Sequence, residues 1–302
     1  MHITLTELRY LIALDKERHF GRAAKRAFVS QPTLSVAVKK LEGELGVTVF
    51  ERNRGEARVT PIGRRIIEQA YRILGEVSAL ETVAEQGRDE LKGALRLGVI
   101  YTVGPYLLPH LIPALRESTP DMPLIIEENF TGALTQQLRN NELDAVIVAM
   151  PYDVGGFSTW PLYDESFVVV MPQTHRWTHR DEIDANELAE ENLLLLGPGH
   201  CFRDQVLSLC EDCRDRERER QPHSGSSLET IRHMVASGLG ITVLPLSAAT
   251  AMQYHEDILA VRPFVAPVPF RTVALAWRVT FPRPKAIDVL SLAASQCRVS
   301  SL

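Results

Sequence analysis

Two cysteines that lie close together in the sequence have the type and spacing for thiol chemistry. Cys201 follows an apolar run and two glycines, and it opens the stretch CFRDQVLSLC, which ends at Cys210. The pattern predicts that Cys201 lies near a helix N-terminus, where the helix dipole, His200 and Arg203 favour a thiolate. A thiolate is the form that peroxide converts to sulfenic acid. The alternative for such a cysteine is an inert, small apolar side chain.

The spacing of Cys201 and Cys210 indicates a switch rather than a structural bridge. Nine residues of continuous helix would separate the two Cα atoms by about 13 Å, whereas a disulfide needs them within about 7 Å. Formation of the bond must therefore unwind or refold the segment between them. An oxidised chain would then hold a different packing of this segment, which is the behaviour of a bistable regulatory element.

Two further cysteines, Cys213 and Cys297, lie outside this pair. Cys213 makes a C-x-x-C pair with Cys210, so it either competes as the resolving thiol or is a bystander. The charged residues 214–221 that follow read as a solvated loop. Cys297 lies in a helical apolar pattern and is expected to pack. The spacing of these thiols and the neighbouring histidine does not match a regular zinc site, so we expect no metal and no other cofactor.

The segments that must position Cys201 alternate between strand and helix patterns from residue 94 onward. Such alternation implies an α/β fold with parallel sheets, and about 210 residues are many for one sheet, so we expect two lobes. The chain would cross between the lobes near 162–168 and 265–271. The predicted strands are 94–100, 123–128, 144–150, 166–172, 192–197, 240–245 and 272–277, and the predicted helices are 104–118, 133–141 and 227–238.

Thr102 follows the first of these strands directly. Ligands of open α/β sheets bind at the carboxyl ends of the strands and between lobes. Thr102 could therefore donate a hydrogen bond to a ligand in the cleft, or it could simply cap the next helix.

The N-terminal segment has the pattern of a helix-turn-helix. Apolar residues at helical spacing predict a helix over 5–17, a short helix with small residues over 20–27 and a third helix over 31–45. Ser30 is a suitable N-cap, and Pro32 falls in the first turn, where its missing N–H is tolerated. Residues 47–63 then read as a two-stranded wing.

The third helix and the wing carry residues suited to DNA. Short polar side chains at the start of the helix fit base edges in a major groove, and lysines further along reach phosphates. Lys40 and Arg58 are additional candidates for backbone contacts. The predicted DNA-binding residues are Gln31, Pro32, Thr33, Ser35, Lys39, Arg52 and Arg54.

Charge and composition support this division. Residues 1–66 contain 13 Lys and Arg against 7 Asp and Glu, whereas the whole chain has a net charge of −5, so only the first segment is basic. The 45% apolar and 24% charged residues are typical of a globular protein and unlike a membrane bundle or a disordered chain. No secretory signal pattern opens the sequence. We therefore expect a cytoplasmic protein that does not contact the membrane.

Residues 64–88 carry an apolar seam with no second element to cover it. Its members are Ile66, Ile67, Ala70, Ile73, Leu74, Val77, Leu80 and Ala84. The pattern favours a long dimerisation helix, and the alternative is a helix packed on the chain's own body.

The stretch AAKRAFVSQPTLSVAVKKLEGELGVTVFERNRGEARVTPIG closely resembles the signature of LysR-type transcriptional regulators. The resemblance implies a winged helix-turn-helix DNA-binding domain, a long linker helix and a regulatory domain with two lobes like those of periplasmic binding proteins. The implied boundaries are 1–62 for the DNA-binding domain, 63–90 for the linker and 91–302 for the regulatory domain, with lobe I at 92–164 and 269–302 and lobe II at 165–268.

The similarity extends to the peroxide-sensing members of this family through HCFRDQVLSLC, YTVGPYLLPHLIP, SSLETIRHMVASGLGITVLP and PVPFRTVALAW. It implies that Cys201 is the peroxidatic cysteine and Cys210 the resolving one. The residues that it implies around the peroxide are Thr102, Thr131, His200, Asp204 and Arg271. The implied partners are double-stranded promoter DNA, hydrogen peroxide, RNA polymerase and further copies of the chain, as a homodimer through the linker helix and a homotetramer.

The sequence thus predicts a DNA-binding activator of antioxidant genes that responds to hydrogen peroxide, and not an enzyme. A second hypothesis is a LysR-type regulator with a small organic co-inducer bound between the lobes. A thiol peroxidase and a metal sensor built on the clustered thiols are further alternatives. A turnover catalyst has no use for a helix-turn-helix, which argues against the peroxidase.

Overall fold

The computed structural model describes residues 3–53, 56–86, 89–210, 212–214, 224–250 and 258–297. These residues divide into two compact units, which are described separately. Residues 1–89 make up nearly all of the first unit, and residues 90–138 and 143–302 make up the second. Within the described part of the chain, no helix is both long and apolar enough to cross a membrane.

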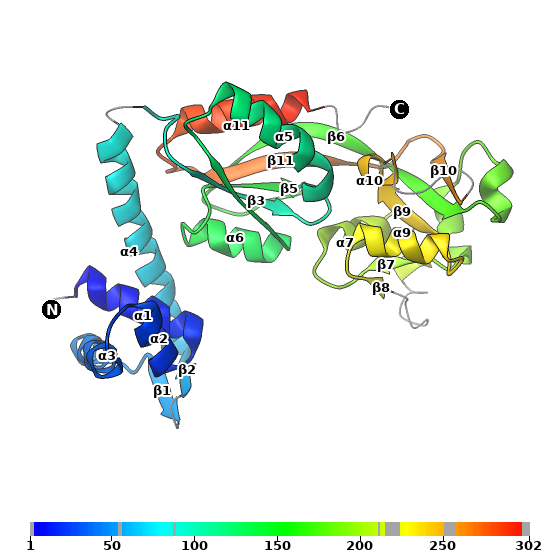
Figure 1. Cartoon of the computed structure of the whole chain (residues 1–302). Helices are drawn as coiled ribbons and strands as arrows, with labels where there is room; N and C mark the ends of the chain where they lie inside the picture. Colours follow the sequence, from blue (N-terminus) through cyan, green and yellow to red (C-terminus); the bar gives the residue numbers. More distant parts are fainter. Residues whose placement is uncertain are drawn as a thin grey trace. The chain divides into compact units, whose positions relative to one another are not determined.

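The first unit is a three-helix core with a hairpin wing and a long helix (Figure 1). Its elements are α1 (Leu5–Glu17), α2 (Phe20–Arg26), α3 (Gln31–Leu45), β1 (Phe50–Asn53), β2 (Glu56–Val59) and α4 (Pro61–Gln86). Ala23 and Ala24 on α2 are buried, and their small side chains let α1 and α3 approach closely. The strands β1 and β2 pair antiparallel. The predicted winged helix-turn-helix is confirmed.

Local capping explains where these helices begin and end. Thr4 and Glu7 form a reciprocal capping box at the start of α1. At α3 the Ser30 hydroxyl accepts a hydrogen bond from the Thr33 backbone N–H at 3.3 Å. Gly46, with φ +68°, ends α3 in the left-handed conformation that glycine adopts most readily. The predicted limits of 5–17 and 31–45 are therefore those of the structure.

The seam of α4 is only partly covered within the chain. Ile67 and Ala70 are buried in the core of the first unit, whereas Ile73 and Leu80 leave 45% and 71% of their surface exposed. The first part of the seam thus packs on the unit's own core, whereas Ile73 and Leu80 are exposed. The side chain of Ala84 lies outside the described residues.

The second unit is an α/β body built on one seven-stranded sheet, with strand order β10-β6-β11-β5-β3-β4 and β9 also paired with β6. The elements that lead to the functional residues are β3 (Leu95–Ile100), α5 (Gly104–Ser118), β4 (Leu124–Asn129), α6 (Thr131–Arg139), β5 (Ala145–Ala149) and β6 (Phe157–Pro172). They are followed by β7 (Leu195–Leu196), α7 (Cys201–Leu207), β8 (Ser224–Gly225), α9 (Leu228–Ala236), β9 (Thr242–Pro245), α10 (Leu246–Thr250), β10 (Leu259–Pro263), β11 (Phe270–Arg278) and α11 (Pro284–Gln296).

The expectation of parallel sheets is only partly right. β3 pairs parallel with β4 and β5, but β11 lies antiparallel between β5 and β6. The strands β9 and β10 also pair antiparallel with β6. The physical reason is that β11 returns from the far part of the chain and enters the sheet in the opposite direction, which the alternation of strands and helices does not reveal.

Two separate cores divide this unit into lobes. One core lies around β3, β5, α5 and α11, and the other around the second half of β6 with α7, α9 and β9. The long strands β6 and β11 run side by side from one core to the other (Figure 1). Where they pass between the lobes, Arg271 lies opposite Glu165 in the register. We call the first core lobe I and the second lobe II.

Candidate functional site

A very small cavity lies where three loops of the second unit meet. Its volume is about 10 Å³, which is roughly the room that one water-sized molecule needs. β3 and β4 are parallel neighbours, so their carboxyl ends lie at the same edge of the sheet and bring Thr102 and Thr131 together. The third loop precedes α7. The lining residues are Ile100, Tyr101, Thr102, Asn129, Phe130, Thr131, Gly199, His200 and Cys201.

Cys201 is the first residue of α7 and carries a free, half-buried thiol. Although α7 belongs to lobe II, Cys201 packs against the core of lobe I. The helix is tied to lobe I by Gln205, whose side-chain amide donates a hydrogen bond to the Met150 carbonyl at 3.0 Å. The sequence suggested a continuous helix from Cys201 to Cys210. In the structure the helix instead ends at Leu207. The thiol thus sits at the boundary between the lobes.

Aromatic rings close the loop side of the cavity. The Phe130 ring lies edge-on to His200 with 4.7 Å between centroids, and Tyr101 lies 5.3 Å from Phe130. Gly199 has φ +98°, and a Cβ atom there would approach the Phe130 ring to 3.3 Å. Glycine is therefore required both by the backbone conformation and by this close approach.

His200, which the sequence predicts to favour a thiolate at Cys201, lines the cavity beside that thiol. The residue is buried, and burial lowers the pKa of its imidazole, while a hydrogen bond with the Ser226 backbone works in the opposite direction. The neutral ring is therefore favoured. Arg203 directs a guanidinium N–H to the Leu196 carbonyl. His200 can serve as a hydrogen-bonding or proton-accepting neighbour of Cys201 rather than as a fixed charge.

Thr102 is buried and is held by Arg271. One guanidinium N–H donates to the Thr102 hydroxyl oxygen at 2.9 Å and another to the Thr102 carbonyl at 2.8 Å. Because this hydroxyl accepts from a cation, its own hydrogen can be donated into the cavity, and the donation is strengthened. The residue that precedes α5 as its N-cap is Val103, so Thr102 does not cap this helix.

Arg271 itself does not line the cavity. Its guanidinium pairs with Glu165 at 2.7 Å, and both side chains are fully buried. The carboxylate of Glu165 also accepts a hydrogen bond from the Ser247 backbone N–H at 3.0 Å. The charge of Arg271, which the family resemblance implied around the peroxide, is thus balanced by a carboxylate, and Arg271 is linked to the cavity through its hydrogen bonds to Thr102.

The other two predicted pocket residues differ in their positions. Thr131 lines the cavity, and its hydroxyl oxygen is buried with no hydrogen-bond partner. A buried hydroxyl of this kind is available to a small polar molecule. Asp204 is exposed on the first turn of α7 and is not among the lining residues.

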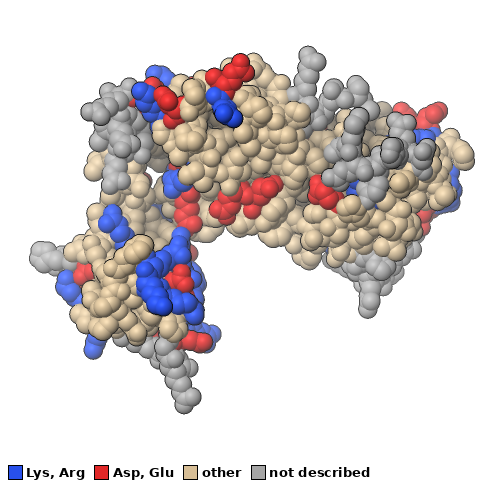
Figure 2. Space-filling view, in the orientation of Figure 1, with Lys and Arg blue, Asp and Glu red and all other residues tan. Residues whose placement is uncertain are grey.

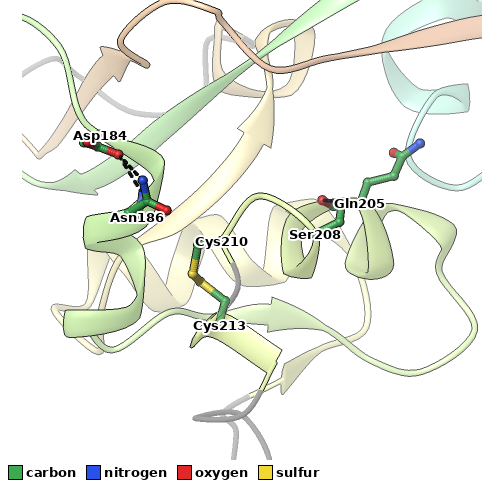
Figure 3. Close-up of a disulfide and its surroundings, with 6 residues drawn as sticks. All are labelled: Asp184, Asn186, Gln205, Ser208, Cys210 and Cys213. Atoms are coloured by element: carbon green, nitrogen blue, oxygen red, sulfur yellow. Dashed lines mark hydrogen bonds between the residues drawn. A yellow bond between two sulfur atoms is a disulfide. The ribbon is translucent and has the colours of Figure 1, made fainter.

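Cys210 and Cys213 form a disulfide with 5.4 Å between their Cα atoms (Figure 3). Both are buried in the core of lobe II, with 4% and 5% of their surface exposed. The structure therefore joins Cys210 to the nearer of its two candidate partners, and the linkage to Cys201 stays a prediction. Among the described residues, no group of three or more His, Cys, Asp and Glu side chains is arranged to hold a metal ion.

Helix α3, the predicted DNA-recognition helix of the first unit, presents a polar surface at its N-terminal end. Gln31, Pro32 and Thr33 are exposed at the start of α3, and Ser35 is half-buried one turn later. In the face drawn in Figure 2, Lys and Arg side chains gather on this unit. The exposed start of a helix with basic neighbours has the composition of a nucleic-acid interface.

The basic side chains around α3 are not equivalent. Lys39 is exposed, but Lys40 donates a hydrogen bond to the buried Glu7 carboxylate at 2.9 Å. That contact lowers the pKa of Glu7 and makes Lys40 a less available phosphate ligand than the sequence suggested. On the wing, Arg58 is exposed on β2, whereas the side chain of Arg52 and the whole of Arg54 lie outside the described residues.

Tyr101, Phe130 and Glu165 are among the residues of the site that were not identified from the sequence. Tyr101 and Phe130 each stand beside a predicted threonine at a strand end, so their positions gave the signal. Glu165 could have been found from Arg271, since an arginine inside an apolar strand needs a buried counter-charge. A matching acid stands in DESFVVV, at the edge of the other long apolar strand.

Comparison with known proteins identifies the family. Residues 5–64 match the lysR-family bacterial regulatory helix-turn-helix protein, and residues 88–297 match the LysR substrate binding domain. The chain belongs to the LysR family. The DNA-binding transcriptional dual regulator OxyR of Escherichia coli K12 is 39% identical over 276 residues, covering 91% of this chain and 90% of that protein.

Solved structures of the LysR family extend the likeness to the whole chain. A cysteine-to-aspartate variant of full-length OxyR from Pseudomonas aeruginosa is 53% identical, with a TM-score of 0.80 over 99% of this chain and 100% of that one. A hydrogen-peroxide-bound cysteine-to-serine variant of OxyR from Corynebacterium glutamicum is 31% identical, with a TM-score of 0.65 over 98% and 92%.

Proposed function

We propose that this LysR-family chain is a DNA-binding transcriptional regulator that senses hydrogen peroxide through oxidation of Cys201 and disulfide formation with Cys210, and that it activates antioxidant defence genes. The observation that carries the proposal is the free Cys201 thiol at a cavity of about 10 Å³ with two hydroxyl groups in its wall. Curated relatives named hydrogen peroxide-inducible genes activator, such as that of Dickeya chrysanthemi at 40% identity, support it.

The oxidation of Cys201 needs only peroxide and the groups around the cavity, whereas the later disulfide step also needs Cys210. The Cys201 thiolate attacks one peroxide oxygen, the O–O bond breaks, and the second oxygen leaves as water after taking up a proton. That proton is the one that the Cys201 thiol gives up when it forms the thiolate. Thr102 can donate a hydrogen bond to the leaving oxygen, and the Thr131 hydroxyl can hydrogen-bond to the other end of the peroxide. The thiol of Cys210 then attacks the sulfenic acid, which releases a second water. Cys210 must be reduced for this step.

The proposal assigns a separate function to each part of the chain. Residues 1–62 bind promoter DNA, residues 63–90 link and dimerise, and residues 91–302 sense peroxide, with lobe I at 92–164 and 269–302 and lobe II at 165–268. Exposed Ile73 and Leu80 on α4 support the dimer. In this proposal the chain forms a homotetramer in the cytoplasm and recruits RNA polymerase. It reacts once with peroxide and does not turn over as an enzyme.

A second candidate is a regulator with an organic co-inducer. The sequence predicted a co-inducer between the lobes, and the cavity at Cys201 is too small for one. A second cavity, of about 310 Å³ and lined in part by His175, Arg176 and Glu191, shares no lining residue with it and lies in lobe II. A volume of this size falls in the range of small-molecule sites. This candidate predicts a response that persists when Cys201 cannot be oxidised.

The proposal is tested on the fully reduced full-length chain with one equivalent of hydrogen peroxide. We expect a sulfenic-acid reagent or a disulfide map to find Cys201 modified within seconds while Cys297 stays a thiol. Burial raises the pKa of the Cys297 thiol, which disfavours its reactive form. The footprint on promoter DNA should change in the same sample. An unmodified Cys201 with an altered footprint would contradict the proposal.

Gln31→Ala should weaken specific DNA binding by about 1–3 kcal/mol, the value of one lost base contact in a major groove. The measurement is fluorescence anisotropy on an operator selected from a random pool and on random DNA. Gln173→Ala is the matched control, because Gln173 is an exposed glutamine in the second unit. An equal loss on both DNAs would instead make Gln31 a backbone contact.

A further inference from the structure

Cys210 has two possible disulfide partners, and they lie on opposite sides of it in the sequence. Cys213 follows after two residues, and Cys201 precedes it by nine. The structure contains the bond to Cys213, buried in the core of lobe II, while Cys201 lies free against the core of lobe I. Cys210 is therefore the shared sulfur between two mutually exclusive disulfides.

The two bonds place different demands on α7. With Cys210 joined to Cys213, α7 is intact from Cys201 to Leu207, and Gln205 keeps its hydrogen bond to lobe I. Figure 3 shows Gln205 pointing away from the disulfide. A bond from Cys210 to Cys201 must instead bring together two sulfurs that now pack on separate cores, so the segment between them has to refold. One disulfide disrupts α7, and the other preserves it.

We propose that Cys213 takes the disulfide over from Cys201, so that Cys210–Cys213 is the end state of a peroxide pulse and Cys201 returns to a thiol. The inference rests on the proposed function and assigns Cys213 as a second resolving cysteine. Peroxide first oxidises Cys201 to the sulfenic acid with release of water, and the Cys210 thiol displaces a second water to give Cys201–Cys210. The Cys213 thiolate then attacks the Cys210 sulfur, the new bond forms, and Cys201 leaves as a thiolate.

The last step needs no external oxidant or reductant, since it is a thiol–disulfide exchange. Two features favour it. Cys213 is tethered to Cys210 through two residues, so it remains close whatever the segment before Cys210 does. The exchange also lets α7 refold with its contacts to lobe I, and it returns both sulfurs of the new bond to the core of lobe II.

The consequence is that the Cys201–Cys210 state is removed by the chain's own Cys213, without an external reductant. After the exchange Cys201 is a thiol again, but Cys210 has no thiol with which to resolve a second sulfenic acid. The chain therefore stays unresponsive until Cys210–Cys213 is reduced. With only 4% and 5% of their surface exposed, these two cysteines are poorly accessible to an external reductant.

The test follows the linkages over time in the reduced full-length chain after one equivalent of hydrogen peroxide, with acid quenching and peptide mass mapping. We expect Cys201–Cys210 to rise first and then fall as Cys210–Cys213 appears and free Cys201 recovers. In Cys213→Ser and Cys213→Ala, Cys201–Cys210 should persist, and the altered DNA footprint should last at least about tenfold longer. Cys297→Ser is the matched control and should follow the unmodified chain.

Two outcomes overturn the relay and leave the proposed function standing. One is a stable Cys201–Cys210 bond in the unmodified chain, with no later Cys210–Cys213 bond. The other is a Cys210–Cys213 bond that forms at an unchanged rate in Cys201→Ser, a variant in which Cys213 is intact. That result would mean that peroxide oxidises the Cys210 and Cys213 pair directly. A chain in which Cys201 is never oxidised would overturn the relay and the proposed function together.

Discussion

Replacing Cys201 with serine should abolish the peroxide-dependent change in DNA contacts and should leave the affinity of the reduced chain for DNA unchanged. Peroxide oxidises a thiolate but not a serine hydroxyl, so neither the sulfenic acid nor the bond to Cys210 can form in this variant. The predicted DNA-binding residues lie in a different compact unit. The measurement is a footprint on promoter DNA with and without peroxide, together with reporter induction in cells.

Cys297→Ser is the matched control for this experiment, because it removes a second free, half-buried thiol that the cavity does not include. It should respond to peroxide like the unmodified chain. Full induction in Cys201→Ser would refute the sensor assignment and would direct attention to the cavity beside Glu191 as an inducer site. Loss of DNA binding without peroxide would mean that Cys201 matters for folding.

The helices were predictable because their limits are set locally. Capping at Ser30, the glycine at Gly46 and the prolines at the starts of α3 and α5 fix the ends within a few residues. The sheet was less predictable. The strand expected at 166–172 begins at Phe157, because its first half pairs with β11, which comes from the far end of the chain. The run expected as a strand over 192–197 forms only β7.

The candidate site shows the same division between local and long-range causes. Thr102 and Cys201 were predictable from their own surroundings, since one stands at the end of a strand and the other at the start of a helix. Thr131 was implied only by the family resemblance. The linkage of Arg271 to Glu165 depends on the register of two strands distant in sequence. The Cys210–Cys213 bond was an open alternative, because spacing alone permits both partners of Cys210.

Arg271→Met should lower the free energy of unfolding of the second unit by about 3–5 kcal/mol, the usual cost of leaving one member of a buried ion pair without its partner. The Glu165 carboxylate would keep only its other contacts, and Thr102 would lose both hydrogen bonds from the guanidinium. Urea unfolding followed by tryptophan fluorescence measures the change. Because Thr102 would no longer be oriented, oxidation of Cys201 by peroxide should also slow.

Two variants separate the buried pair from a general effect of losing an arginine. Arg176→Met removes an arginine whose side chain is 61% exposed in its pair with Glu191, and it should leave the unfolding midpoint nearly unchanged. Arg271→Met combined with Glu165→Leu should be less destabilised than the two single changes added together, since no buried charge is left alone. Additive losses would mean that Arg271 and Glu165 act independently, and the route from Glu165 through Arg271 to the Thr102 hydroxyl would then be wrong.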